Sequence, residues 1–292
     1  MDPTALAYEQ IIERFVQWAQ SEENIRTAVV IGSRARTDHP ADEWADLDIV
    51  ILARDLGPYL KEAQWVGRFG QPWITFLEPT PGGPGMERRV LYEGGLDVDF
   101  AFFPQTVMEQ ALKEALPPEM NHAFGRGFRV LLDKDGFMDL LKTALVELPP
   151  PPRPTPEQVL NVINDFWYHA VWTAKHLRRG ELWWAKGSCD GHLKELLRQM
   201  LEWHAHAMKG PGHDTWMRGR FLEEWADPRA VEGLKQAFAH FDEQDIWRNL
   251  LATMDLFRWV AVETAEKSGY AYPTLGDERA TELVRKLYKG RR

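Results

Sequence analysis

A run of prolines near the middle of the chain most constrains its fold, because it separates two stretches with different hydrophobic periodicity. Pro149-Pro150-Pro151-Pro152-Arg153-Pro154 favours an extended polyproline conformation and cannot continue a helix. Before it lie short β-branched and aromatic runs, and after it apolar residues recur with helical spacing. We therefore predict an α+β fold. An N-terminal domain with a mixed β-sheet flanked by helices (1–148) precedes a proline-rich linker (149–156) and an all-helical C-terminal domain (157–292).

Local patterns predict where the elements lie. An N-cap residue followed by proline, Asp2-Pro3, opens a helix whose apolar face continues to about Gln20. Gly94-Gly95 predicts a tight hairpin between two strands. Strands are expected at 26–31, 47–52, 73–77, 89–92, 96–102 and 128–132, and a helix at 137–148. In the C-terminal domain, helices are expected at 157–177, 182–208, 230–240, 245–267 and 278–287.

Composition and charge exclude several classes of protein. The single cysteine, Cys189, excludes an intrachain disulfide and a cysteine-rich zinc site. No apolar run approaches the ~18 residues of a membrane span, and no leader sequence is evident, so we expect a cytoplasmic protein without a membrane partner. The formal net charge of −9 argues against a nucleic-acid surface and suits a small cationic substrate. We expect a monomer or a weak homodimer.

Acidic residues open the second predicted strand. Because side chains alternate along a strand, Asp46 and Asp48 point the same way, with Cα atoms ~7 Å apart. Two such carboxylates repel each other unless a cation lies between them, and Mg²⁺ binds a few carboxylates together with water and phosphate oxygens. The apolar run from Ile49 to Leu52 indicates that this strand is buried. The pattern predicts a magnesium site.

A third carboxylate from a neighbouring strand would allow a second metal ion ~4 Å away. Asp97 and Asp99 share one face of a later strand, so alternation alone does not choose between them. We favour Asp99, because Phe100 to Phe103 continues as a core strand, whereas Asp97 lies nearer the Gly94-Gly95 turn.

Gly32-Ser33 follows the first predicted strand and supplies the features of a phosphate site. A glycine there lets the backbone approach a triphosphate, while the serine hydroxyl and nearby amides donate to its oxygens. Arg34 and Arg36 add positive charge. Neither a Walker A motif nor a Gly-x-Gly-x-x-Gly motif after a strand is present, which excludes the P-loop and dinucleotide-binding classes.

These segments resemble a known family. Val29 to Arg36, followed by Asp46 to Val50, is similar to the motif of polymerase-β-like nucleotidyltransferases in the form found in aminoglycoside 6-adenylyltransferases. Three later segments resemble the same family: Asn164-Asp165-Phe166-Trp167, Lys175 to Leu182, and Leu197 to Trp203. The resemblance covers both halves of the chain, more closely up to Trp203 than beyond it. It departs at Asp165, where the family often has glutamate.

The resemblance implies transfer of AMP from ATP to a hydroxyl group of streptomycin, with release of pyrophosphate. Two Mg²⁺ ions, both held by Asp46 and Asp48 and one also by Asp99, would act on the acceptor oxygen and the triphosphate. In the helical half, Lys175 and Arg179 would meet the triphosphate, with ion pairing on a helix surface as the alternative. Four acidic residues are the candidate contacts to an aminoglycoside, with solvated helix carboxylates or ion pairs as the alternative: Asp165, Glu181, Asp190 and Glu195.

Other functions stay open. An enzyme of the same fold could act on a different aminoglycoside, a lincosamide or a protein hydroxyl. A ligand-binding module without catalysis is disfavoured, because Asp46, Asp48 and Asp99 are all retained. RNA-directed transfer is disfavoured by the acidic net charge. A zinc site at His204 and His206 is also disfavoured, since residues two apart on a helix point to different faces.

Overall fold

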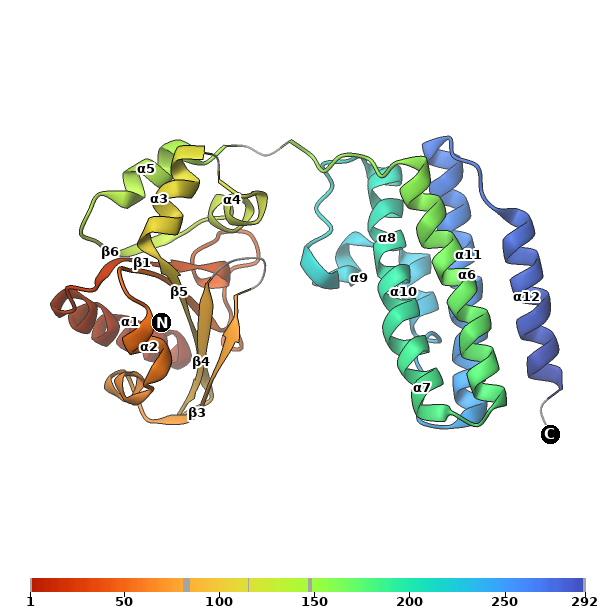
Figure 1. Ribbon diagram of the computed structural model, residues 1–292, viewed down its shortest axis with the longest axis horizontal. Coiled ribbons are helices and arrows are strands. Elements are labelled where there is room, and N and C mark those ends of the chain that lie inside the picture. Colours follow the sequence, from red (N-terminus) through yellow and green to blue (C-terminus); the bar gives the residue numbers. More distant parts are fainter. Residues whose placement is uncertain (1, 81–84, 115, 147–148, 291–292) are drawn as a thin grey trace. The chain divides into compact units, whose positions relative to one another are not determined.

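The structure, a computed structural model, describes residues 2–80, 85–114, 116–146 and 149–290. The chain divides into two compact units, the sheet unit Met1–Pro149 and the helical unit Pro150–Arg292 (Figure 1). A mixed sheet with flanking helices forms the first unit and helices alone form the second, which confirms the predicted fold class. Leu148, where we expected a helix and the first domain to end, lies outside the described residues.

The sheet unit is built around one mixed six-stranded sheet with the order β3-β4-β5-β2-β1-β6. Only β2 and β5 run parallel among these neighbours; the other pairs are antiparallel. The strands are β1 (Ile25–Ile31), β2 (Leu47–Ala53), β3 (Pro72–Pro79), β4 (Met86–Tyr92), β5 (Leu96–Pro104) and β6 (Arg129–Asp133). All six overlap the strands predicted from the sequence. Gly94 and Gly95 both have positive φ, 87° and 77°, as a tight hairpin between β4 and β5 requires.

Helices of the sheet unit cover the two faces of the sheet. They are α1 (Pro3–Ser21), α2 (Gly57–Lys61), α3 (Gln105–Glu114), α4 (Pro118–Gly125) and α5 (Phe137–Ala144). α2, α3 and α4 were not predicted from the sequence. The prediction for α5 was too long, since Leu145 already has extended backbone angles.

Two apolar cores fix which way the strands face. On one face α1 packs through Phe15 against Ile49 and Phe100, all buried. On the other face residues of α3, α4 and α5 pack against Val50 and Ala101. Val50 and Ala101 lie two residues beyond Asp48 and Asp99 on the paired strands β2 and β5. Strand alternation therefore places the two aspartates on the α3–α5 face, at the margin of its core.

The helical unit comprises α6 (Pro156–Arg178), α7 (Leu182–Gly187), α8 (Leu193–Lys209), α9 (Leu222–Trp225), α10 (Pro228–Leu234), α11 (Glu243–Ser268) and α12 (Thr274–Lys289). Figure 1 shows α6, α8, α11 and α12 as long, roughly parallel rods. A capping box between Thr155 and Gln158 opens α6, so the helix begins as soon as the prolines allow. None of the helices in the described ranges combines the length and the apolarity that a bilayer crossing requires.

Two predictions for the helical unit need correction. The helix expected at 182–208 is interrupted by a π-helical segment, η3 (Ser188–His192), between α7 and α8. The helix expected at 230–240 ends at Leu234, so Phe238 and His240 lie in the loop that leads to α11. In η3 one extra residue fits into the turn, which changes the direction of the side chains that follow.

Candidate active site

Three carboxylates converge at the margin of the sheet. Asp48 and Asp99 are direct partners on the parallel strands β2 and β5, and Asp46 lies just before β2. One ligand oxygen from each of the three lies within 4.8 Å of the others. Asp99 is buried, whereas Asp46 and Asp48 are partly exposed. We call Asp46, Asp48 and Asp99 the acidic cluster; its all-oxygen donor set fits Mg²⁺, the ion expected from the sequence.

The turn after β1 is shaped around this cluster. Gly32 has φ 72°, and a Cβ atom at this position would collide with the carboxylate of Asp48. Glycine is therefore required both by the backbone angle and by the space that Asp48 takes. The hydroxyl oxygen of Ser33 is buried and has no hydrogen-bond partner among the described residues. An unpaired buried hydroxyl beside carboxylates that suit a metal is what a phosphate oxygen could satisfy.

Arg34 and Arg36 brace the loop between β1 and β2. The Arg34 guanidinium donates from Nε to the backbone oxygen of Asp46 at 2.9 Å and from Nη2 to that of Ala45 at 2.5 Å. It also stacks 3.6 Å above the ring centre of Tyr8. Arg36 donates from Nε to the backbone oxygen of His39 at 3.0 Å. These contacts hold Asp46 in position; a role for either arginine in binding ATP stays a prediction.

Asp97 lies apart from the cluster. Its side chain is exposed, and Tyr8 donates its hydroxyl hydrogen to Asp97 Oδ1 at 3.1 Å. Burial, with a further contribution from Asp97, raises the pKa of Tyr8 to about 12, so the phenol keeps its proton and stays a donor. The structure thus brings Asp99, rather than Asp97, together with Asp46 and Asp48.

Two residues of β4 that the sequence analysis missed border the cluster. Arg89 is the antiparallel partner of Asp99, and its Nη2 lies 3.4 Å from both Asp99 Oδ2 and Glu87 Oε2. Its Nε lies 2.6 Å from Glu78 Oε1. This pair could have been predicted from the register of the hairpin. Counting residues away from the Gly94-Gly95 turn along both strands places Arg89 opposite Asp99.

Charge is only partly balanced at this edge of the sheet. Burial raises the pKa of Asp99 to about 7; Arg89 opposes this shift, while Glu87, Asp46 and Asp97 add to it. Burial likewise raises the pKa of Glu87, with Arg89 opposing. The one guanidinium of Arg89 thus contacts three carboxylates, those of Glu78, Glu87 and Asp99. A bound cation would therefore stabilise the charged form of the cluster.

In the helical unit, three of the four candidate carboxylates are paired with permanent cations. Glu181 accepts a hydrogen bond from Arg179 Nε at 2.7 Å and also contacts His176. Both oxygens of Glu195 contact Arg198. These are the surface ion pairs that the sequence analysis kept as the alternative. Arg179, expected to meet the triphosphate, is thus engaged with Glu181.

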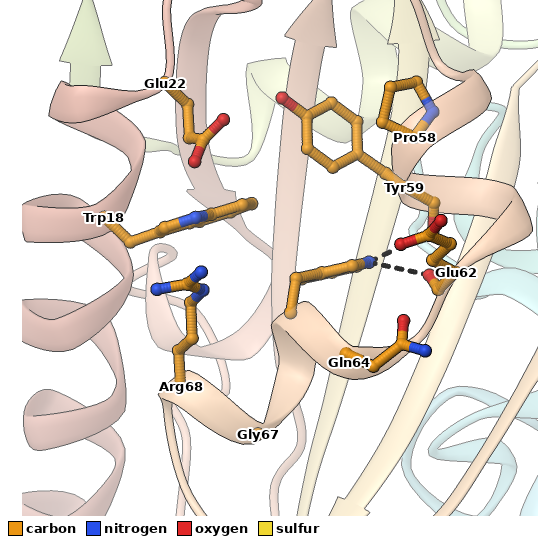
Figure 2. Close-up of a pocket in the computed structure, with 9 residues that line it drawn as sticks. Trp18, Glu22, Pro58, Tyr59, Glu62, Gln64, Gly67 and Arg68 are labelled. Atoms are coloured by element: carbon orange, nitrogen blue, oxygen red, sulfur yellow. Dashed lines mark hydrogen bonds between the residues drawn. The ribbon is translucent and has the colours of Figure 1, made fainter.

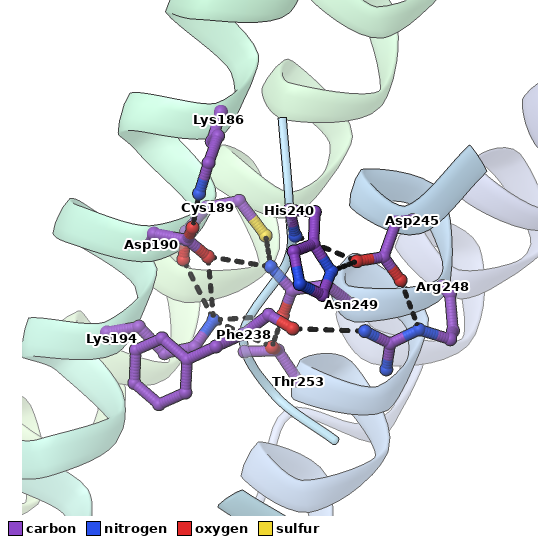
Figure 3. A network of polar contacts seen from close by, with 10 residues as sticks. All are labelled: Lys186, Cys189, Asp190, Lys194, Phe238, His240, Asp245, Arg248, Asn249 and Thr253. Atoms are coloured by element: carbon purple, nitrogen blue, oxygen red, sulfur yellow. Dashed lines mark hydrogen bonds and ion pairs between the residues drawn. The ribbon is translucent and has the colours of Figure 1, made fainter. Parts of the chain in front are cut away.

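Asp190 belongs to a network between η3, α8 and α11 (Figure 3). It contacts Lys186 and accepts a hydrogen bond from Asn249 Nδ2 at 2.7 Å. The neighbouring Lys194 is buried and donates to the backbone oxygen of Cys189 at 2.9 Å and to Thr253 Oγ1 at 2.8 Å. Burial lowers the pKa of Lys194 and raises that of the Cys189 thiol to about 11. The network fixes η3 against α11, and Cys189 is an inert thiol within it.

Asp165 is the exception among the four. It is bonded to two imidazoles, from His169 Nδ1 at 2.5 Å and His192 Nε2 at 2.9 Å. Among the described residues, these two rings are its only ion-pair partners. Of the four candidates, Asp165 is therefore the one without a lysine or arginine partner in the part of the chain that the structure describes.

Two pockets lie outside the acidic cluster. The first, about 510 Å³, lies beside α1 in the sheet unit and is lined by Trp18 (Figure 2). The ring centroids of Trp18 and Trp65 are 5.4 Å apart, with nearly parallel planes. Trp65 Nε1 donates to backbone oxygens of Tyr59 and Glu62, so its ring is fixed. The second, about 430 Å³, lies along α6 and α12 and includes Trp172 and the exposed Lys175. Lys175 thus lines an aromatic groove; its role in binding triphosphate stays a prediction.

Comparisons with known proteins cover nearly the whole chain. A family model described as streptomycin adenylyltransferase matches residues 7–287. An aminoglycoside 6-adenylyltransferase of Bacillus subtilis (strain 168) is 26% identical over 96% of this chain and 97% of its own length. A protein of the same name from Campylobacter jejuni is 21% identical over 96% of each chain. The crystal structure of an aminoglycoside 6-adenyltransferase from Bacillus subtilis covers 96% of this chain and 98% of its own, with 23% identity and a TM-score of 0.43.

Proposed function

The chain belongs to the streptomycin adenylyltransferase family, a family of nucleotidyltransferase enzymes, and from this premise we propose that it transfers AMP from ATP to a hydroxyl group of an aminoglycoside. The observation that carries the proposal is the acidic cluster of Asp46, Asp48 and Asp99 beside the Gly32-Ser33 turn. We further propose that the acceptor is streptomycin, that AMP is transferred to its 6-position, and that the enzyme is located in the cytoplasm.

In the proposed reaction, the acceptor oxygen forms a bond to the α-phosphorus of ATP. The bond between that phosphorus and the bridging oxygen to the β-phosphate breaks, pyrophosphate leaves, and the hydroxyl proton is released. Two Mg²⁺ ions, when bound, would neutralise the triphosphate and lower the pKa of the acceptor hydroxyl. Asp46 and Asp48 would hold both ions, and Asp99 would join one of them. No covalent intermediate with the enzyme is required.

The turn after β1 is proposed to hold the triphosphate. The Ser33 hydroxyl, buried and unpartnered among the described residues, would donate to a phosphate oxygen. Gly32 gives the phosphates access to the backbone and leaves room for the Asp48 carboxylate. Arg34 would act indirectly, by holding the backbone of Asp46 in place. Catalysis of this kind depends mainly on positioning and charge neutralisation.

The proposed acceptor is a polycation. The net charge of −9 favours its approach, and burying a guanidinium or ammonium group costs several kcal/mol unless a carboxylate meets it. Asp165 is the best candidate for this contact in the helical unit, because it has no lysine or arginine partner among the described residues. Glu181, Asp190 and Glu195 would have to give up existing ion pairs first.

Mass spectrometry of acceptors tests the proposal. The enzyme is incubated with ATP, Mg²⁺ and one compound at a time: streptomycin, other aminoglycosides and a lincosamide. We expect streptomycin to gain the mass of one AMP, with pyrophosphate released in equal amount, and the Asp48→Asn enzyme to give no product. A panel in which no aminoglycoside is modified would overturn the proposal. If only the lincosamide gained AMP, the proposed nucleotidyl transfer would be supported, but an aminoglycoside would be ruled out as the acceptor.

A further inference from the structure

Asp165, His169 and His192 form a second group of potential metal ligands, remote in sequence from the acidic cluster. One ligand atom from each residue lies within 4.8 Å of the others. The two imidazole rings are 4.3 Å apart between centroids and meet edge to face. Three Lewis-basic groups of the kinds that bind metals thus share one small volume.

Local structure explains how the three residues meet. Asp165 and His169 are four residues apart on α6, so they lie on the same face of the helix. His192 is the last residue of the π-helical segment η3, and its Nε2 reaches the Asp165 carboxylate. Lys194, donating to the carbonyl oxygen of Cys189, holds this segment in place from the other side. Single π-helical turns inside α-helices are frequently found at functional sites.

The electrostatic setting differs from that of other carboxylates in this unit. Glu195 and Asp190 are paired with arginine or lysine, but Asp165 is paired with two imidazoles, whose nitrogens can also bind a metal ion. The side chains of Asp165, His169 and His192 are 30%, 33% and 43% exposed, so a cation in solution has access to them. The group therefore offers two imidazole nitrogens and one carboxylate oxygen.

We propose that Asp165, His169 and His192 form a binding site for a divalent first-row transition metal such as Zn²⁺ or Co²⁺. Imidazole nitrogen suits these ions, whereas Mg²⁺ prefers the oxygen ligands of the acidic cluster. With metal–nitrogen bonds of ~2.0–2.1 Å and tetrahedral angles, two ligand atoms of one ion lie ~3.3 Å apart, so the group needs side-chain shifts of up to ~1.5 Å. Three protein ligands leave at least one coordination position open to water or to another ligand.

This site does not depend on the proposed function, but it would interact with it. A metal ion would neutralise the carboxylate that we propose meets the aminoglycoside, so metal and acceptor would compete for Asp165. The proposed site is also chemically distinct from the acidic cluster, which contains oxygen ligands only. The two sites can therefore be separated by the choice of metal.

Cobalt binding tests the site directly. The full-length protein is titrated with CoCl₂ in a large excess of Mg²⁺, without ATP or aminoglycoside, and followed by calorimetry and by visible absorption. We expect one Co²⁺ per chain with a visible band typical of nitrogen ligation. His192→Asn and His169→Gln should each weaken binding at least ~10-fold, the lower end of the loss seen even for outer-shell partners. His176→Gln is the matched control, because this α6 histidine pairs with Glu181 instead and should bind Co²⁺ as the parent does.

The outcomes are distinct. Absence of the cobalt band in the parent protein, or equal affinity in His192→Asn and the parent, would overturn the site. Circular dichroism of each variant excludes misfolding, and Asp165→Asn gives a third, nearly isosteric test. AMP transfer is measured in parallel with Mg²⁺ alone, so failure of the metal site and failure of the proposed function are seen separately.

Discussion

The carboxylates of the sheet unit and those of the helical unit have opposite electrostatic surroundings. In the sheet unit, strand register forces Asp48 and Asp99 together and Asp46 beside them, with Arg89 as the cation in contact with Asp99. In the helical unit, three of the four candidate carboxylates have a lysine or arginine partner two to four residues away along the chain, as Glu195 has Arg198. Arg89 in the sheet unit contacts three carboxylates at once, whereas Glu181, Asp190 and Glu195 in the helical unit each contact a lysine or arginine of their own.

The difference indicates which carboxylates are available to a ligand. Surface ion pairs on helices contribute little to stability, typically ~0.3–0.5 kcal/mol, and form wherever the spacing allows. Converging carboxylates on neighbouring strands repel each other, so their retention together points to a bound cation. Asp165 resembles the sheet residues in this respect, since its partners are imidazoles.

Removing one charge from the acidic cluster should have the largest effect. Asp46→Asn, Asp48→Asn and Asp99→Asn should each lower kcat/KM for AMP transfer by more than ~100-fold, the upper range for mere outer-shell partners of a metal. Asp97→Asn is the matched control and should be mild, because Asp97 is bound to Tyr8 outside the cluster. Steady-state kinetics decides; a damaging Asp97→Asn with a mild Asp99→Asn would mean that the wrong aspartate has been assigned.

Gly32→Ala should disturb the cluster without changing its charge. Its Cβ atom would push the Asp48 carboxylate aside, and displacement by ~1 Å can lower activity ~100-fold. Gly136→Ala provides the control, because Gly136 has nearly the same φ, 71°, with nothing within 4 Å of the added Cβ. Both variants should lose stability through backbone strain, but only Gly32→Ala should lose Mg²⁺-dependent activity. Equal activities in the two variants would show that the collision with Asp48 is harmless.

Asp165→Ala should weaken streptomycin binding by ~2–5 kcal/mol, at least ~30-fold, because a buried cation would lose its carboxylate. ATP binding should be nearly unchanged. Glu195→Gln is the comparison within the same unit, and it should leave streptomycin affinity near the parent value since Glu195 already pairs with Arg198. Calorimetry gives the answer: unaltered affinity in Asp165→Ala would move the acceptor contact elsewhere.

The smallest effect concerns pH and stability without divalent ions. Burial raises the pKa of Asp99 to about 7 in the folded protein, so the folded state holds a proton that the unfolded state has released. The contribution of Asp99 is therefore fully present below about pH 4 and is lost as the pH rises through about 7. Denaturant unfolding should show this decline in the parent and less of it in Asp99→Asn. If the free energy of unfolding declined equally with pH in the parent and in Asp99→Asn, the decline would be caused by other titratable groups.

The sequence predicted the sheet unit well because its signals are local. Alternation along the second predicted strand paired Asp46 with Asp48, although Asp46 lies just before β2, and the context of β5 favoured Asp99 over Asp97. Arg89 and Glu87 were missed, although the Gly94-Gly95 hairpin sets the register of β4 against β5. To predict their position beside Asp99, residues must be counted away from the turn along both β4 and β5.

The helical unit was less predictable for physical reasons. Which cation pairs with Glu181 or Asp190 depends on rotamers and on helix packing, which periodicity does not determine. The π-helical segment left no pattern in the sequence, yet it determines where His192 points. The spacing of Asp165 and His169 on one helix was visible, but their meeting with His192 depends on η3 and on the packing of α6 against it.

The central claim is that Asp46, Asp48 and Asp99 jointly hold metal ions. Electron paramagnetic resonance counts bound Mn²⁺ in the presence of a non-hydrolysable ATP analogue. The protein carries His192→Asn, so that the site proposed in the helical unit does not contribute. We predict about two Mn²⁺ per chain, as in two-metal sites, with loss in Asp48→Asn and retention in Asp97→Asn. Unchanged Mn²⁺ binding in Asp48→Asn would show that the acidic cluster does not hold the metal ions through Asp48.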